Sequence, residues 1–439
     1  MKITTKDYLG MALTAFLMAG NVHVAVAQST IEAQTKTTET TEVKVVAPVY
    51  EAPKGKEIYI PQDLQENDFT SSDSKWSFAR CAYTDDIIVF WEKPFGNDLS
   101  QAPDLDGHNM KVDLKNLLGR LQSFYDYYKN ELKFIKPGSN ADQFRMMVML
   151  NYSLEGTAYG GDYDGVIGAL WIAPNRVQDK KLNCIAHELG HSFQSMISCD
   201  HQGKGGMTGG FFEMTSQWML WNVNPEWPTD ENYHWKAFID HANLRFLDGE
   251  NIYHSPYILE YWSMKHGLTV IADVFREGMR GEDPASTYMR MFSLTPEDFA
   301  REAVDCYSRL LTFDFPGKHE MNKKYAGEFV NDKPLQVFGA NVIKLDTKGK
   351  KVAKVTFTGA DKGDGYAYRL VAVKQNAEAV YGDISTKQKS TLKLNLPADT
   401  KDVYLVVTGY PLGEYKPYTF NPYSHEKPEE PHIYTYNIK

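Results

Sequence analysis

Residues 183–191 read NCIAHELGH and contain the pattern His-Glu-x-x-His. On an α-helix, two histidines four residues apart lie on the same face, about one turn from each other. The imidazoles of His187 and His191 can therefore bind a single Zn²⁺, and Glu188 beside them is free to act as a general base. This short segment thus indicates a metal, a base and a class of reaction together.

The residues around this pattern predict an amphipathic helix over about 183–196. Its apolar stripe comprises Leu182, Ile185, Ala186, Leu189, Phe193 and Met196. His187 and His191 fall on the opposite face, with Glu188 at its edge, and Asp179 is the predicted N-cap. The stripe anchors the helix and directs the histidines into a cleft. The alternative is a pair of solvated histidines on an ordinary surface helix.

A third ligand is expected, because a catalytic zinc usually has three protein ligands and one open position. In metzincins it is a histidine six residues after the second one, but Ile197 occupies that position, so that class is excluded. We predict Glu213, early in a second helix that starts near Thr208. The alternative is that Glu213 only stabilises its helix N-terminus electrostatically. Gln217, one turn later, is predicted to orient a ligand imidazole.

These ligands resemble those of the gluzincin metallopeptidases, in which His-Glu-x-x-His on one helix is followed by a glutamate on the next. Residues 209–213, GGFFE, and the tryptophan-rich helix after them are similar to a secreted bacterial zincin-like family of unknown function. The ligand pattern is also similar to that of enhancin-like, mucin-directed peptidases. The resemblance covers residues 60–320 and implies a peptidase fold more firmly than it implies a substrate.

The resemblance also implies a downstream histidine or tyrosine that stabilises the oxyanion of the reaction. We nominate His254, then Tyr253 and Tyr257, at the start of a helix predicted to have Ser255 as N-cap and Pro256 as first residue. The alternative for each of them is a purely structural role.

The first 27 residues read as a secretory signal peptide. Lys2 and Lys6 form its positive region, residues 9–19 its apolar region and residues 25–27 a small-residue cleavage site. The alternative is a retained membrane anchor, but the apolar region is short for a span. Residues 28–58, rich in Thr, Glu, Lys and Pro, predict a flexible linker. We therefore expect a secreted or periplasmic protein with no membrane span after signal cleavage.

Four cysteines, at positions 81, 184, 199 and 306, allow three disulfide pairings in an oxidising compartment. A bridge between Cys184 and Cys199 is disfavoured, because it would span about 20 Å of helix. The other pairings and free thiols remain open. Cys184 lies on the histidine face, but His187, His191 and Glu213 already make a complete set of zinc ligands.

The whole chain predicts an α+β fold, with a zincin-like catalytic domain over residues 59–325 and a small all-β sandwich over 334–439. The strand at 166–172 is expected to border the cleft and pair with an extended substrate; the alternative is an ordinary sheet strand. Residues 162–165 resemble a fragment of a calcium loop, but a plain turn is the simpler interpretation. Further strands are predicted at 87–91, 144–150, 352–357, 368–373, 392–396 and 403–407, and a long helix at 112–132.

Together these patterns predict a secreted zinc metallopeptidase that hydrolyses peptide bonds of proteins or glycoproteins through a metal-activated water. The formal net charge of −10 disfavours nucleic acid and anionic membranes as partners. The first alternative is a non-catalytic protein- or glycan-binding protein on a zincin scaffold, against which the intact Glu188 argues. The second is zinc-assisted hydrolysis of a bond other than the peptide bond.

Overall fold

The computed structural model describes residues 49–206, 210–318, 320, 323–360, 363–418 and 431–439. The predicted signal peptide and most of the predicted linker lie outside the described residues. Near the end of that linker, the backbone amides of Tyr50 and Glu57 donate to the carbonyls of Thr70 and Gln143. Hydrogen-bonded structure therefore begins before residue 58.

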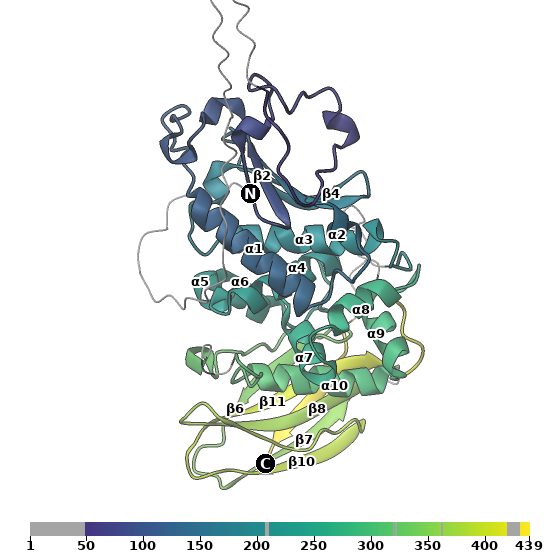
Figure 1. Ribbon diagram of the computed structural model, residues 1–439. Helices are drawn as coiled ribbons and strands as arrows, with labels where there is room; N and C mark the ends of the chain where they lie inside the picture. Colours follow the sequence, from purple (N-terminus) through teal and green to yellow (C-terminus); the bar gives the residue numbers. More distant parts are fainter. Residues whose placement is uncertain (1–48, 207–209, 319, 321–322, 361–362, 419–430) are drawn as a thin grey trace, which may run out of the picture.

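A five-stranded sheet lies in the upper part of the molecule in Figure 1. β2, β3 and β5 are parallel neighbours, whereas β1 and β4 pair antiparallel with the strands beside them. β2 and β3 are buried along their whole length, and the predicted strands at 87–91, 144–150 and 166–172 are confirmed as β2, β3 and β5. In spatial order, the strands are β1 (Cys81–Tyr83), β2 (Ile87–Trp91), β3 (Met146–Leu150), β5 (Ile167–Ile172) and β4 (Ala158–Tyr163).

The edge strand next to β5 is β4, which the sequence did not predict. Its residues, AYGGDY, include two glycines and no β-branched side chain, so the usual strand signal is absent. Because β5 lies between β3 and β4, the prediction that residues 166–172 border the cleft is wrong, and β4 takes that place. The carboxylate of Asp162 accepts from the amide of Gly165 at 2.7 Å, so the predicted turn at 162–165 is confirmed.

Helix α3 (Asn183–Cys199) packs on β4 and β5 and carries the His-Glu-x-x-His pattern. The prediction of a helix at 183–196 is confirmed, and its predicted apolar stripe is buried. Helix α1 (Leu114–Asn130) holds α3 from another side. The hydroxyl of Tyr128 donates to the carbonyl of Ala186 at 3.0 Å, and Tyr125 and Tyr128 meet Phe193 edge-on. The long helix predicted at 112–132 is thereby confirmed as α1.

The other helices lie between the first sheet and the C-terminal sheets (Figure 1). Helix α7 begins one residue later than predicted, because Pro256 and not Ser255 is its N-cap. The bounds are α2 (Asn140–Gln143), α4 (Gly210–Val223), α5 (Trp227–Asp230), α6 (Asn232–His241), α7 (Tyr257–His266), α8 (Val270–Glu277), α9 (Pro284–Phe292) and α10 (Pro296–Leu310).

Two antiparallel sheets form the C-terminal part of the chain and share a hydrophobic core. Across that core, the ring of Phe357 stacks on that of Tyr368, with centroids 3.8 Å apart. All the strands predicted in this part are found. One sheet is β10 (Lys389–Asn395), β7 (Val352–Gly359) and β12 (Tyr434–Ile438); the other is β6 (Ala340–Leu345), β11 (Thr400–Pro411), β8 (Asp364–Lys374) and β9 (Ala379–Tyr381).

Helix α10 covers the outer face of the four-stranded sheet (Figure 1). The main hydrophobic core runs without a break from the helices into this face, where it includes Val371 and Val406. Arg369 of β8 is buried there and forms an ion pair with Asp305 of α10, with an N–O distance of 2.5 Å. The division into separate domains at residues 325 and 334 remains a prediction.

The structure combines helices and sheets, in agreement with the predicted α+β class. Within the described residues, no helix is both long and apolar enough to cross a membrane. All four cysteines lie within the described residues and are free thiols, so none of the possible disulfide pairings is formed. Burial raises the pKa of Cys81, Cys184 and Cys199 to about 12.

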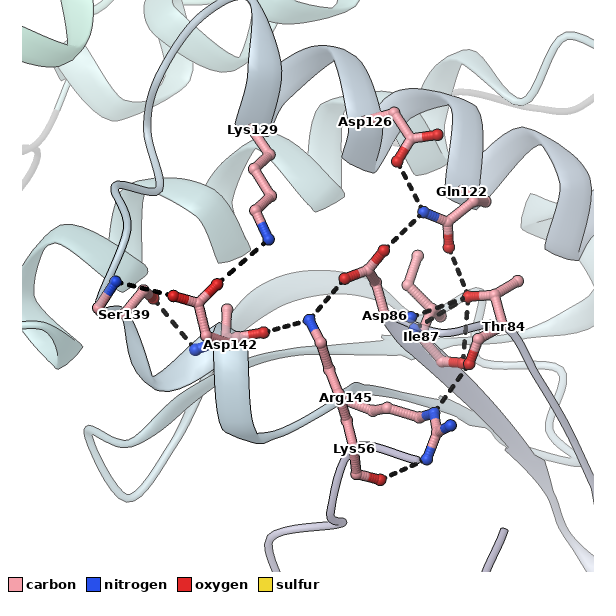
Figure 2. A network of polar contacts seen from close by, with 12 residues as sticks. Lys56, Thr84, Asp86, Ile87, Gln122, Asp126, Lys129, Ser139, Asp142 and Arg145 are labelled. Carbon is pink, nitrogen blue, oxygen red and sulfur yellow. Dashed lines mark hydrogen bonds and ion pairs between the residues drawn. The ribbon is translucent and has the colours of Figure 1, made fainter. Parts of the chain in front are cut away.

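Arg145, just before β3, joins the N-terminal segment to the first sheet (Figure 2). Its guanidinium donates to the carbonyls of Lys54 and Thr84, both at 2.8 Å, and to that of Lys56. The residue is 1% exposed, so these carbonyls depend on it for hydrogen bonds. In the same region Lys129 forms a partly exposed ion pair with Asp142 at 3.4 Å.

We expect Arg145→Met to lower the free energy of unfolding by about 2–4 kcal/mol, because three carbonyls lose their donor. Urea denaturation of the purified protein measures this. The control is Lys129→Met, which removes a partly exposed ion pair and a contact with the ring of Tyr125, and is expected to change stability by about 1 kcal/mol or less. Equal effects of the two substitutions would contradict this account of the segment.

Candidate metal centre

Helix α3 starts without the predicted cap. Leu182, just before it, has a left-handed backbone with φ of 54°, and no side chain caps the helix. The prediction of Asp179 as N-cap is therefore wrong. The side chain of Asp179 accepts instead from the amide of Lys181 at 3.2 Å, in the turn that precedes the helix.

Three predicted ligand atoms converge at one point between α3 and α4. The Nε2 atoms of His187 and His191 lie 3.1 Å apart, and each lies 3.2 Å from Oε2 of Glu213. The histidine side chains are 11% and 15% exposed. In the described part of the chain, this is the one group of three histidine, cysteine or carboxylate ligands within 4.8 Å of one another.

This triangle fits a zinc ion in both chemistry and size. Zn²⁺ binds imidazole nitrogen and carboxylate oxygen at about 2.0–2.1 Å in a tetrahedron, which places its ligand atoms about 3.3 Å apart. Three lone pairs that face one another at 3.1–3.2 Å repel unless a proton or a cation lies among them. Two imidazoles and one carboxylate also leave the fourth zinc position to the cleft.

The imidazole of His191 is oriented by Gln194 and Ser216. The side-chain nitrogen of Gln194 donates to the carbonyl of Phe212 at 2.9 Å, which turns its oxygen toward Nδ1 of His191, 3.0 Å away. The hydroxyl of Ser216 lies 3.2 Å from the same nitrogen. Nδ1 therefore carries the proton, and the lone pair of Nε2 points to the other two ligands.

Gln217 does not have the role that the sequence predicted for it. Its side-chain nitrogen donates to the carbonyl of Tyr253 at 3.1 Å instead of orienting a ligand imidazole. Gln194 and Ser216 are not among the site residues predicted from the sequence. Gln194 lies three residues after His191, a spacing at which helical side chains meet, so its role had a local signal. Ser216 reaches the imidazole from another helix and had none.

Glu213 lies in the first turn of α4, whose described part begins at Gly210; the predicted start at Thr208 lies outside the described residues. Burial raises the pKa of Glu213, but hydrogen bonds and attraction from His187 and His191 lower it more strongly. The pKa is therefore well below its usual value. The carboxylate stays ionised, as a metal ligand must.

Glu188 points from α3 to the edge strand. Its Oε2 accepts from the amide of Gly160 at 2.9 Å. Burial raises the pKa of Glu188 by more than His187 and His191 lower it, so the pKa is above its usual value. A raised pKa moves a carboxylate toward the neutral range in which a general base is most effective.

The contact between β4 and α3 requires glycine. A Cβ atom on Gly160 would lie 1.7 Å from the carbonyl oxygen of Glu188. A Cβ atom on Gly161, by contrast, would meet ring atoms of Tyr159 at 3.1 Å, and that side chain is 60% exposed and free to move. Gly160 is therefore the residue that lets the strand approach the helix backbone.

These groups line an open cleft of about 480 Å³ formed by β4, α3, α4 and the turn before α7. Of the three residues nominated to stabilise an oxyanion, only Tyr253 lines it, with its ring stacked 6.2 Å from that of His187. Tyr257 is 1% exposed and packs edge-on against Trp221 in the core.

His254, the first nominee, is also not among the residues that line the cleft. Its Nδ1 lies 2.6 Å from Nδ1 of His234. Burial, together with His234 and His241, lowers the pKa of His254 to about 4. The structure therefore brings neither His254 nor Tyr257 to the metal site, because their side chains turn into the protein interior.

A family model described as "Family of unknown function (DUF6055)" matches residues 51–439 of this chain. The chain therefore belongs to this family. The matched range includes every residue of the candidate metal centre. A comparison with curated proteins finds no match.

Two solved structures from Clostridium perfringens are similar to this chain at a low level. The M60 catalytic domain of ZmpC, in complex with the sialyl T antigen, is 15% identical with a TM-score of 0.29; the match covers 79% of this chain and 69% of that one. The catalytic module of the metalloprotease ZmpA is 12% identical with a TM-score of 0.32, over 79% and 68% of the two chains. Similarity at these levels does not establish a shared fold or activity.

We expect Gln194→Met to lower the affinity for Zn²⁺ by about 10- to 100-fold, because Nδ1 of His191 loses the nearer of its two partners and keeps only the hydroxyl of Ser216. Competition with a chelator of known affinity measures this. Gln178→Met is the matched control, since the Gln178 side chain donates to the carbonyls of Lys111 and Pro174 on the surface. Unchanged affinity in Gln194→Met would contradict its orienting role.

We expect Gly160→Ala to lower the free energy of unfolding by about 1–3 kcal/mol or more, because the added methyl group separates β4 from α3. Gly161→Ala, one residue along the same strand, is expected to have a clearly smaller effect. Urea denaturation of both variants measures the difference. Equal stability of the two would mean that the strand does not depend on this contact.

Proposed function

We propose that this protein is a secreted zinc-dependent metallopeptidase that hydrolyses peptide bonds of proteins or glycoproteins. The observation that supports this best is the convergence of ligand atoms from His187, His191 and Glu213 beside the carboxylate of Glu188 in an open cleft. Structural zinc sites are usually closed by four protein ligands, whereas catalytic sites keep one position for water or substrate. Three ligands that face a cleft favour the catalytic kind.

In this proposal, His187, His191 and Glu213 hold the metal through Nε2, Nε2 and Oε2. Bound zinc supplies a Lewis acid that polarises a carbonyl group and makes water more acidic. The residues around the ligands fix their direction: Gln194 and Ser216 hold the imidazole of His191 in one tautomer and one orientation. The site is thereby organised before a substrate arrives.

Glu188 is the proposed proton carrier. Its carboxylate takes a proton from the water that attacks the carbonyl carbon, and then gives it to the leaving amine as the carbon–nitrogen bond breaks. The amide of Gly160 holds Oε2, which leaves Oε1 for the proton. The raised pKa of Glu188 suits both halves of this transfer.

The edge of β4 is the proposed binding site for an extended substrate. The carbonyl of Thr157 accepts from the amide of Ala173, on the side of β5. In an antiparallel ladder successive residues alternate in direction, so the backbone groups of Gly160 and Asp162 face away from β5. The amide of Gly160 already donates to Glu188, so a peptide would add through the carbonyl of Gly160 and the backbone groups of Asp162. This binding mode would lead a peptide bond past Glu188.

Tyr253 is the proposed donor to the oxyanion. Burial, with the carboxylates of Glu213 and Glu188, raises the pKa of Tyr253 above its usual value, so its hydroxyl keeps the proton it would donate. Tyr253 is 42% exposed and lines the cleft. A secreted or periplasmic location and a protein or glycoprotein substrate belong to the same proposal, from the predicted signal peptide and the resemblance of the ligand pattern.

The test combines metal analysis with the variant Glu188→Gln. We expect one zinc per chain in both proteins, because Glu188 is not a ligand. Hydrolysis is expected to fall by about 100- to 10,000-fold in the variant, since glutamine cannot accept the proton. Mass spectrometry of a panel of glycosylated and deglycosylated proteins measures cleavage and locates the bonds that are cut.

Two results would contradict the proposal. Absence of bound metal in the purified protein would remove its basis. Bound zinc without cleavage of any member of the panel by the unmodified protein would instead favour a non-catalytic binding protein on the same scaffold.

A further inference from the structure

The turn at residues 251–255 carries Tyr253 to the cleft and is anchored at both ends. Asn251 is 1% exposed, and its side chain donates to the carbonyl of His241 at 2.8 Å. The hydroxyl of Ser255, also buried, lies 3.0 Å from the carbonyl of Phe246, to which it donates. Tyr253 is the exposed residue of this turn. The anchored turn thus directs one side chain, that of Tyr253, to the cleft.

Gln217 supports this turn from α4. It lies one helical turn after Glu213 and is 4% exposed. Its side-chain nitrogen donates to the carbonyl of Tyr253 at 3.1 Å and lies 3.4 Å from Nε2 of His234. The helix that provides one metal ligand therefore also holds the backbone of the residue that faces the metal site.

A partly buried chain of polar contacts reaches the same turn from α3. Asn183, the first residue of α3, donates to Glu231 at 3.0 Å. The other oxygen of Glu231 lies 3.4 Å from Nε2 of His234, whose Nδ1 lies 2.6 Å from Nδ1 of His254. Glu231 thus links α3, which bears both histidine ligands, through His234 to His254, the residue after Tyr253.

We propose that Gln217 and His234 are positioning residues that hold the hydroxyl of Tyr253 beside Glu213 and His187. This inference rests on the proposed function and deepens it, because it names the residues that hold the oxyanion donor in place. A donor in a fixed place needs no reorganisation as charge develops, which is why preorganised donors are effective. Loss of the support would leave the turn held only at its ends.

A positioning role is separated from a structural one by a double-mutant cycle. Gln217→Met keeps the length of the side chain and removes its donor, and Tyr253→Phe keeps the ring and removes the hydroxyl. We expect kcat to fall about 10-fold in the first and about 100- to 1,000-fold in the second, with KM nearly unchanged. The double variant is expected to be no slower than Tyr253→Phe alone, because Gln217 acts through that hydroxyl.

Hydrogen–deuterium exchange gives a readout that needs no substrate. In Gln217→Met and His234→Phe, the amides of residues 251–255 are expected to exchange faster, while α3 keeps its protection and the protein still binds one zinc. The control is Asn341→Leu, which removes a buried amide that donates to Lys333 at 2.9 Å and Tyr434 at 2.7 Å in the C-terminal sheets. It is expected to leave the exchange of the turn and kcat unchanged.

If the two fold-losses of kcat multiply in the double variant, or if the exchange of the turn is unchanged in both variants, the inference is overturned. Faster exchange of the turn in a protein that cleaves no substrate would have a different meaning. The anchoring of Tyr253 would then stand, and only the proposed function would fail.

Discussion

The candidate site depends on a backbone contact between β4 and α3 that is closer than any side chain would allow. Gly160 makes this contact at Glu188; Gly168 of the neighbouring strand β5 also packs tightly on α3, where an added Cβ would lie 3.0 Å from the carbonyl oxygen of Ser192. Because the strand and the helix touch through their backbones, the amide of Gly160 reaches the carboxylate of Glu188 directly. The close packing of β4 on α3 thus places the edge of the sheet, the general base and the ligands.

Two glutamines on neighbouring helices orient different parts of the candidate site. Gln194 of α3 bridges to α4 and directs the imidazole of His191, whereas Gln217 of α4 reaches away from the ligands to the backbone of Tyr253. Both are buried, and the side-chain nitrogen of each has fixed partners. The metal ligands and the cleft wall are therefore held by different hydrogen bonds, which separate substitutions can remove one at a time.

The hydrophobic periodicity of the sequence predicted the features that depend on the spacing of nearby residues. The apolar stripe of α3 places His187 and His191 on the open face whatever the rest of the chain does, so helix and histidines could be predicted. The edge strand could not, because its glycines serve close approach to α3 and carry no strand propensity. The choice among Tyr253, His254 and Tyr257 failed for a related reason. Adjacent residues in a turn point in different directions, and only the fold decides which direction is the cleft.

The unbroken core between the helices and the C-terminal sheets has a thermodynamic consequence. Separation of the four-stranded sheet from α10 would expose apolar surface of both and break the buried Arg369–Asp305 pair, so neither part keeps its stability alone. We therefore expect the helices and the C-terminal sheets to unfold together. By linkage, a metal ion held between α3 and α4 would protect the C-terminal sheets against unfolding and proteolysis, although it touches none of their residues.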